Sequence, residues 1–194
     1  MRRLARRFLL TLTVAAGSLA LPVAGATASE EGWQALRQPG AVAIMRHALA
    51  PGTGDPANFR VDDCATQRNL DERGRAQARA IGEAFRANGI EVDRVLSSQW
   101  CRCRDTADLL DLGPVEELPS LNSFFGSRGD REQQTEATRA FLADLAADER
   151  AVLVTHQVNI TALTGAYPSS GEVFVLDVGE DGGVEITGRI LIAP

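Results

Sequence analysis

Two kinds of pattern alternate along the chain: short apolar runs and stretches with helical periodicity. Two apolar runs end alike, because residues 41–45 lead into Arg46 and His47, and residues 151–155 lead into His156. Apolar runs of this length, bounded by turn residues, are typical of buried strands. We therefore predict two buried strands that each place an imidazole at the carboxyl end, and the chain contains only these two histidines.

The segments between the apolar runs predict helices. Asp71 is a suitable N-cap, the spacing of Ala78, Ile81 and Phe85 predicts a helix of about five turns, and Gly89 is a suitable end. Further helices are predicted over residues 30–37, 99–110, 130–148 and 158–163.

Strands that alternate with helices predict an α/β fold. Shorter strands are expected over residues 92–96 and 115–118, and a hairpin over residues 172–192 around a Glu-Asp-Gly-Gly turn. The serine pair at 97–98 is expected to cap the helix that follows it. We predict one domain over residues 29–194, a three-layer α/β/α sandwich whose mostly parallel sheet is made mixed by the hairpin.

The first 28 residues read as a secretory leader. Four arginines precede an apolar segment, residues 8–23, and small residues at 24–28 offer a cleavage site. The apolar segment contains Gly17 and Pro22 and is shorter than the roughly 20 residues that span a bilayer. We expect a periplasmic or secreted protein with no stable membrane span after cleavage.

The net charge and the type of basic residue restrict the partners and reactions that this chain can have. Removing residues 1–28 would take away four of the twenty basic residues and leave a net charge of −10, and such an overall charge disfavours binding to nucleic acid. Every basic residue is arginine, which excludes lysine Schiff-base chemistry and leaves guanidinium as the side chain that can grip an anion.

Three cysteines are present. In an exported protein Cys64 is expected to pair with either Cys101 or Cys103, which leaves one thiol unpaired. A metal site is not expected, because the Cys-x-Cys spacing differs from that of zinc pairs and only two histidines are available.

The two histidines and nearby arginines are suited to phosphoryl chemistry. Strands of an open α/β sheet gather ligands at their carboxyl ends, where His47 and His156 would meet. Arg46 lies beside His47, and Arg102 lies near the start of a predicted helix, where backbone N–H groups also favour anions. A neutral imidazole can attack phosphorus and carry the phosphoryl group.

Four ordered segments resemble the signatures of the histidine phosphatase superfamily, which has the phosphoglycerate mutase-like fold. They are Met45-Arg46-His47-Ala48 and residues 69–78, 95–107 and 152–156. The resemblance implies that His47 is the phosphorylated nucleophile and that Arg46, Arg102 and His156 complete the phosphate pocket. It implies no metal and no cofactor.

The resemblance leaves the general acid open. Relatives that act on ordinary esters usually supply a Glu or Asp from the loop that here spans residues 121–126, and this loop contains no carboxylate. Glu116, Glu117, Asp55 and Asp63 remain as alternatives. A leaving group that departs easily, such as a phosphoramidate or acyl group, needs little protonation.

The leading hypothesis is an exported, metal-independent phosphatase that hydrolyses a phosphomonoester or similar phosphoryl compound through phospho-His47. The alternative is a catalytically weak phosphate-binding or sensing module of the cell envelope. The expected partner is a small phosphorylated substrate, and exported relatives suggest a cell-envelope sugar phosphate. The long loops at residues 49–63 and 121–129 would frame the substrate.

Overall fold

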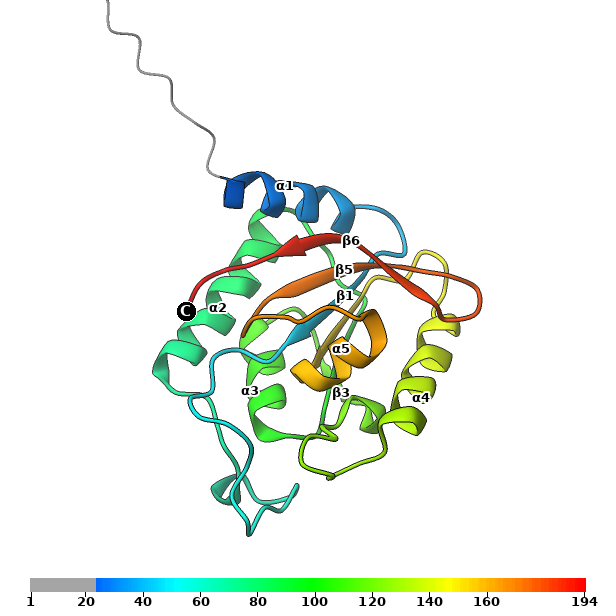
Figure 1. The fold of residues 1–194 in the computed structure, drawn as a ribbon. Helices are drawn as coiled ribbons and strands as arrows, with labels where there is room; N and C mark the ends of the chain where they lie inside the picture. Colours follow the sequence, from blue (N-terminus) through cyan, green and yellow to red (C-terminus); the bar gives the residue numbers. More distant parts are fainter. Residues whose placement is uncertain (1–23) are drawn as a thin grey trace, which may run out of the picture.

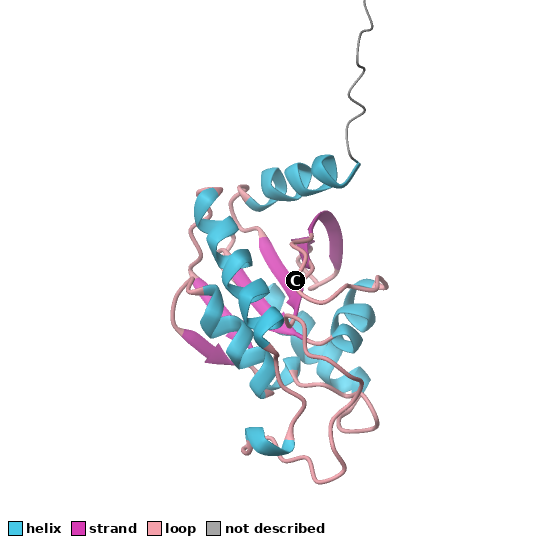
Figure 2. Ribbon diagram, turned by 90° about the vertical axis from the view of Figure 1, so that its left-hand side faces the viewer, coloured by secondary structure: helices cyan, strands magenta, loops and turns pink. Residues whose placement is uncertain are grey.

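The computed structural model describes residues 24–194, which form one six-stranded sheet with helices on both faces (Figures 1 and 2). The strand order is β3-β2-β4-β1-β5-β6. The four parallel strands are β1 (Val42–Arg46), β2 (Arg94–Ser97), β3 (Val115–Glu117) and β4 (Ala151–Thr155). The two antiparallel strands are β5 (Val173–Val178) and β6 (Val184–Ile190), which confirms the predicted mixed sheet and its closing hairpin.

Alternate residues of the strands face two separate apolar cores. Ala43 and Met45 of β1 face the core shared with α1 (Ala24–Leu36), α2 (Glu72–Ala87) and α3 (Cys101–Leu110). Val42 and Ile44 face the core shared with α4 (Arg131–Ala143) and α5 (Gln157–Thr164). Figure 1 shows α2 and α3 on one side of the sheet and α4 on the other. The predicted three-layer α/β/α arrangement is therefore confirmed.

Helix α3 begins later than the sequence pattern predicts, and the serine pair does not cap it. Its N-cap is Trp100, whose side chain makes no capping bond. The hydroxyl of Ser97 donates to the carbonyl of Ser98, and the hydroxyl of Ser98 contacts His156 and Asn122. Both hydroxyls have other partners, so the prediction of a serine cap was wrong.

Helix α4 begins as predicted but ends earlier. Asp130 caps its first turn by accepting from the backbone N–H of Gln133. The helix ends at Ala143, and the backbone N–H of Ala146 then bonds to the Glu149 side chain in a turn that leads into β4. The predicted extension to residue 148 was wrong because this side chain stabilises a turn there.

The long connections lie at the carboxyl ends of the parallel strands. Residues 47–71 leave β1 and reach α2, with only a short 3-10 helix, η1 (Cys64–Thr66), in between; they form the cyan projection of Figure 1. A second connection contains the 3-10 helix η2 (Pro119–Leu121) and reaches α4. Both predicted loops therefore lie at the edge of the sheet where the two histidine-bearing strands end.

The predicted leader, residues 1–28, lies largely outside the described residues, which begin at Ala24 with the first turn of α1. Within residues 24–194, no helix combines the length and the apolar character needed to cross a bilayer.

Candidate active site

The parallel pairing of β1 and β4 brings the two histidines together. Arg46 and Thr155 are partners in the register of these strands, and the next residue of each strand is a histidine. The backbone N–H of His47 donates to the carbonyl of Thr155 over 2.9 Å. The two imidazole centroids lie 5.6 Å apart, and both side chains are buried.

Arg102 lies between the two imidazoles, at the second residue of α3. Its Nε donates to Nε2 of His47 over 3.2 Å, and its Nη2 lies 3.4 Å from Nδ1 of His156. The Arg102 side chain is 3% exposed, so these contacts form away from bulk water. The structure therefore joins three of the residues singled out from the sequence in one cluster.

The hydrogen bonds of His47 fix its tautomer. Nε2 accepts from Arg102, which can only donate, so this nitrogen carries a lone pair. Nδ1 lies 2.7 Å from the carbonyl oxygen of Ala48, which can only accept, so this nitrogen carries the proton. The nucleophilic lone pair of His47 is therefore directed toward the guanidinium of Arg102.

His156 has the opposite tautomer, which follows from a chain of hydrogen bonds. The backbone N–H of Gln99 donates to Oδ1 of Asn122 over 2.8 Å, which identifies that atom as the amide oxygen. The hydroxyl of Ser98 must then donate to the same oxygen, over 3.2 Å. Oγ of Ser98 is left to accept from Nε2–H of His156 over 2.9 Å, and the lone pair of His156 lies on Nδ1.

Burial and positive charge keep both imidazoles neutral. Burial, and then the charge of Arg102, lower the pKa of His47 well below its ordinary value, although its bond to Ala48 opposes the shift. The same two causes lower the pKa of His156. A neutral His47 is the form that can act as a nucleophile.

The histidines and Arg102 line a pocket of about 160 Å³ that contains two further arginines, Arg46 and Arg68. Nε of Arg46 is buried without a hydrogen-bond partner among the described residues, although its Nη1 donates to the carbonyl of Pro168. Three guanidinium groups and the single carboxylate of Asp55 give the pocket a net charge of +2 while the histidines are neutral. This charge matches a phosphate dianion.

The rest of the pocket comes from three connections. The loop after β1 supplies residues 52–54, and the loop after η2 supplies Ser123 and Phe125. The segment that follows β4 supplies Gln157, Val158 and Tyr167. The expectation that residues 49–63 and 121–129 frame the substrate therefore agrees with the lining of this pocket.

The four candidate general acids have separate positions. Asp55 lines the pocket, and both oxygens of its carboxylate accept from Arg102. Glu116 is paired with Arg94 and Glu117 with Arg104 on the exposed strand β3, and Asp63 caps η1 by accepting from the backbone N–H of Ala65. Only Asp55 of these four faces the site.

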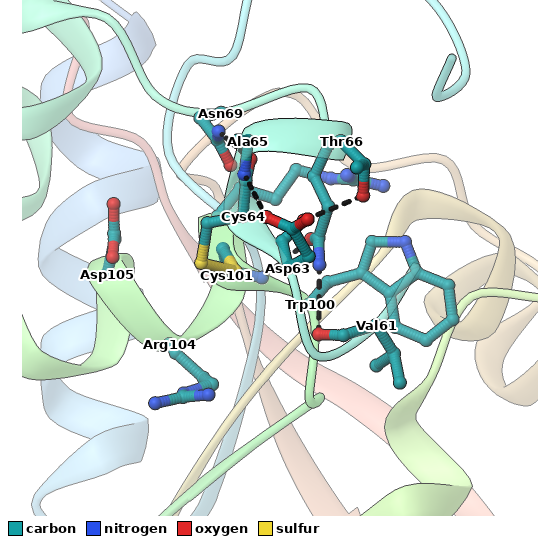
Figure 3. The surroundings of a disulfide bond; sticks show 12 residues. Val61, Asp63, Cys64, Ala65, Thr66, Asn69, Trp100, Cys101, Arg104 and Asp105 are labelled. Carbon is teal, nitrogen blue, oxygen red and sulfur yellow. Dashed lines mark hydrogen bonds between the residues drawn. A yellow bond between two sulfur atoms is a disulfide. The ribbon is translucent and has the colours of Figure 1, made fainter. Parts of the chain in front are cut away.

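A disulfide joins the loop after β1 to the start of α3. It links Cys64 with Cys101, the residue immediately before Arg102, and Figure 3 shows η1 lying against the first turn of α3 at this point. The side chain of Gln67 also accepts from the backbone N–H of Cys101 over 2.9 Å. The loop is thus fastened to the helix that presents Arg102, and one of the two expected pairings is the one observed.

The remaining thiol, Cys103, is buried beside His156. Its sulfur lies 3.4 Å from Nε2 of His156, and burial raises the pKa of the thiol to about 12. The thiol is therefore neutral and packs against the imidazole. Among residues 24–194, no group of three or more His, Cys, Asp or Glu side chains is placed to hold a metal ion.

Several residues of the site were not anticipated from the sequence. Arg68 was not singled out, Ser98 was interpreted as a helix cap, and Asn122 was only part of a loop expected to frame the substrate. The available signal for Arg68 was the length of the loop itself, since long loops often carry function. Nothing in the local pattern connected Ser98 with a histidine 58 residues away.

The sequence was compared with models of known protein families. Residues 42–140, just over half of the chain, match the family model described as histidine phosphatase superfamily (branch 1). The chain belongs to the histidine phosphatase superfamily. The matched region contains Arg46, His47 and Arg102, and the protein is a phosphatase of the histidine phosphatase type.

Solved structures of the superfamily share the fold of this histidine phosphatase. The protein histidine phosphatase SixA, solved with tungstate, is 20% identical over 77% of this chain and 96% of its own, with a TM-score of 0.57. YhfR of Bacillus stearothermophilus is 16% identical over 76% and 95%, with a TM-score of 0.56. A mycobacterial glucosyl-3-phosphoglycerate phosphatase is 18% identical over 75% and 97%, with a TM-score of 0.55. No curated protein sequence matches this histidine phosphatase.

Proposed function

We propose that this chain is an exported, metal-independent phosphatase that hydrolyses small phosphoryl compounds through a phosphohistidine on His47. The observation that carries the proposal is the direction of the Nε2 lone pair of His47, which points to the guanidinium of Arg102 while Nδ1–H is held by the carbonyl of Ala48. A phosphoryl group placed between His47 and His156 would meet the nucleophile and its charge-stabilising partner together.

The proposed reaction has two displacements. In the first, Nε2 of His47 forms a bond to phosphorus, and the leaving-group oxygen or nitrogen departs with the electron pair of the broken bond and takes any proton it needs from solvent. Arg46, Arg68 and Arg102 bind the non-bridging oxygens and stabilise their charge. In the second, a water molecule attacks phosphorus and loses a proton to solvent, the P–N bond breaks, and its electron pair returns to Nε2, releasing inorganic phosphate.

The pocket also favours leaving groups that depart without strong acid assistance. Its only carboxylate, Asp55, already accepts from Arg102, and the loop position where relatives supply an acid places Ser123 against the pocket. We therefore expect faster turnover of aryl, acyl or phosphoramidate substrates than of simple alkyl phosphates.

Two exposed aromatic side chains support a substrate whose phosphoryl group carries an organic body. Phe125 and Tyr167, 49% and 67% exposed, both line the pocket. Exposed rings beside an anion site offer flat apolar surfaces for the body of a substrate whose phosphate is bound between the histidines.

Export is supported by the basic and apolar leader and by the disulfide between Cys64 and Cys101, because disulfides persist in oxidising compartments. A periplasmic or secreted enzyme of this kind would act on phosphoryl compounds outside the cytosol, including those of the cell envelope.

The test uses residues 29–194 with p-nitrophenyl phosphate and EDTA, from about pH 4 to 8 across the imidazole range. We expect turnover that survives EDTA, falls on the order of 10⁴-fold in His47→Ala and falls about 10²- to 10³-fold in Arg102→Ala. Arg104→Ala is the matched control, because Arg104 lies on the same helix with an exposed side chain.

The outcomes separate the phosphatase from the binding module. A phosphatase acquires a phosphoryl label on His47 and continues to hydrolyse substrate after the first burst of p-nitrophenol. A protein that binds inorganic phosphate but neither releases p-nitrophenol nor acquires a label would be the weak phosphate-binding or sensing module. Equal activity in wild type and His47→Ala would contradict a phosphohistidine mechanism.

A further inference from the structure

Arg102 has no free hydrogen-bond donor. A guanidinium carries five N–H groups, and all five have protein acceptors here. Nε donates to His47, Nη1 donates to Asp55 and to the carbonyl of Arg68, and Nη2 donates to Asp55 and His156. A bound phosphate must therefore replace some of these acceptors, and the geometry indicates which ones.

The acceptors lie on two different edges of the guanidinium. Nε and Nη2 form one edge, which faces the imidazole nitrogens of His47 and His156 at 3.2 and 3.4 Å. Nη1 and Nη2 form the other edge, which binds the two oxygens of Asp55 at 2.7 and 3.2 Å. A phosphoryl group between the histidines can take over the first edge while the bidentate pair with Asp55 remains intact.

Asp55 is itself saturated with donors. Besides Arg102, Oδ1 accepts from the backbone N–H of Arg68 over 3.0 Å, and Oδ2 accepts from Nε1 of Trp100 over 3.1 Å. Burial alone would raise the pKa of Asp55, but the hydrogen bonds and charge of Arg102 hold it below its ordinary value. An ionised carboxylate with four donors has no proton to give to a leaving group.

The elements that carry these donors are fastened together. Trp100 and Arg102 flank Cys101, whose disulfide to Cys64 joins the start of α3 to the loop that contains Asp55 and Arg68. The side chains of Asp55 and Arg102 are 5% and 3% exposed, so the carboxylate is held against the guanidinium rather than sampling solvent.

We propose that Asp55 is a positioning residue for the phosphoryl-transfer reaction, which holds Arg102 by one edge so that the other edge faces the group transferred to His47. The inference rests on the proposed function and deepens it. In this role Asp55 does not act as a general acid, and its contact with Arg102 explains why a carboxylate lies in a pocket suited to anions.

The proposal predicts that Asp55→Asn lowers kcat without raising KM. The side chain keeps its size but loses the bidentate pairing, so the free edge of Arg102 is no longer fixed, and we expect kcat to fall about 10- to 100-fold. KM should stay constant or decrease, because the change also removes a negative charge near the bound dianion. Nonspecific damage to the pocket would instead raise KM.

A pair of substrates separates positioning from acid catalysis. p-Nitrophenyl phosphate has a good leaving group and an alkyl phosphate such as glycerol 2-phosphate has a poor one. A positioning residue lowers kcat for both by the same factor and leaves the shape of the pH profile unchanged. A much greater loss with the alkyl phosphate would overturn the proposal in favour of a general acid, and higher activity in the variant would overturn it in favour of an inhibitory contact.

Asp62→Asn is the matched control, because it removes the same charge from an exposed position in the same loop, where Asp62 pairs with Arg60 at the surface. Both variants should first show a cooperative unfolding transition well above the assay temperature, and Asp55→Glu should recover part of the lost kcat. Failure of Asp55→Glu to exceed Asp55→Asn would contradict a role for the carboxylate charge.

A binding measurement keeps the inference separate from the proposed function. Trp100 contacts Asp55 and lies against His156, so its fluorescence can report inorganic phosphate and orthovanadate in the pocket. We expect the wild type to prefer vanadate, and Asp55→Asn to retain phosphate binding but lose most of that preference. Unchanged preference would overturn the role of Asp55. A wild type that binds both anions without turnover or labelling would refute the phosphatase mechanism, while the change in preference would still decide the role of Asp55.

Discussion

At the scale of single residues, the site depends on two imidazoles that carry their protons on different nitrogens. His47 is protonated on Nδ1, because the carbonyl of Ala48 accepts there, and His156 on Nε2, because Oγ of Ser98 accepts there. Each tautomer leaves a lone pair directed at Arg102. With these two tautomers, both imidazole rings can face the same phosphoryl group.

Nitrogen-15 NMR of histidine-labelled protein tests this arrangement directly, since the chain contributes only two imidazoles. We expect one Nδ1–H and one Nε2–H signal set. Because the pKa of each imidazole is lowered, both should remain neutral as the pH is reduced through 6.5, the ordinary pKa of histidine, and protonate only at lower pH. A signal that titrates near 6.5, or two identical tautomers, would contradict the assigned network. His156→Gln would identify each set.

The sequence predicts the residues of the site that end strands and fails for those that come from loops. His47 and His156 could be placed together because β1 and β4 are apolar runs whose parallel pairing follows from the fold. Arg68 and Asn122 could not, because their positions depend on how two long connections fold over the sheet. The pairing of Cys64 with either Cys101 or Cys103 was also open, so the sequence did not show how the connection after β1 is fastened.

At the scale of elements, α2 lies close to its neighbours through two glycines. A Cβ added at Gly74 would lie 1.9 Å from the carbonyl oxygen of Leu49, and one added at Gly82 would lie 1.9 Å from that of Leu110. Leu49 follows Ala48, the acceptor for Nδ1 of His47, whereas Leu110 ends α3 away from the pocket. The two contacts are therefore equivalent in packing but not in function.

We expect Gly74→Ala and Gly82→Ala each to lower the free energy of unfolding by about 1–3 kcal/mol, because the clash with backbone outweighs the better helix propensity of alanine. Urea denaturation measures this loss. Only Gly74→Ala should also lower kcat, by about 10-fold at a temperature where both variants are folded, since it shifts the backbone beside His47. Equal kcat in the two variants would show that α2 does not position the nucleophile.

The ends of elements are harder to predict than their existence. The apolar runs and the spacing of Ala78, Ile81 and Phe85 locate the strands and α2 to within a few residues. The end of α4 was missed because the Glu149 side chain stabilises a turn, and the start of α3 was missed because Ser98 serves His156 instead. In both cases a side-chain hydrogen bond determines where the helix begins or ends, which the apolar pattern does not specify.

At the scale of the whole molecule, α1 is part of the folded domain. Trp33 and Leu36 are buried, and the Trp33 ring makes an edge contact with Phe85 of α2 at a centroid distance of 5.4 Å. A Cβ added at Gly32 would lie 2.6 Å from Cγ1 of Ile190, so the helix also lies directly against β6. The sheet is thus covered at its hairpin edge by α1, whose first residues overlap the predicted leader.

This packing limits where the leader can be removed. A chain of residues 29–194 retains Trp33 and Leu36, and we expect its urea unfolding midpoint to match that of residues 24–194. A chain of residues 38–194 loses both side chains, and because removal of one such buried residue costs about 2–5 kcal/mol, the combined loss approaches the whole stability of a typical domain. We therefore expect residues 38–194 to show no cooperative transition. Trp33→Ala in the 29–194 chain is the graded control, with an expected loss of about 3–5 kcal/mol. Equal midpoints for the 29–194 and 38–194 chains would mean that α1 adds nothing to the fold, and that cleavage well beyond Ala28 would leave the active site intact.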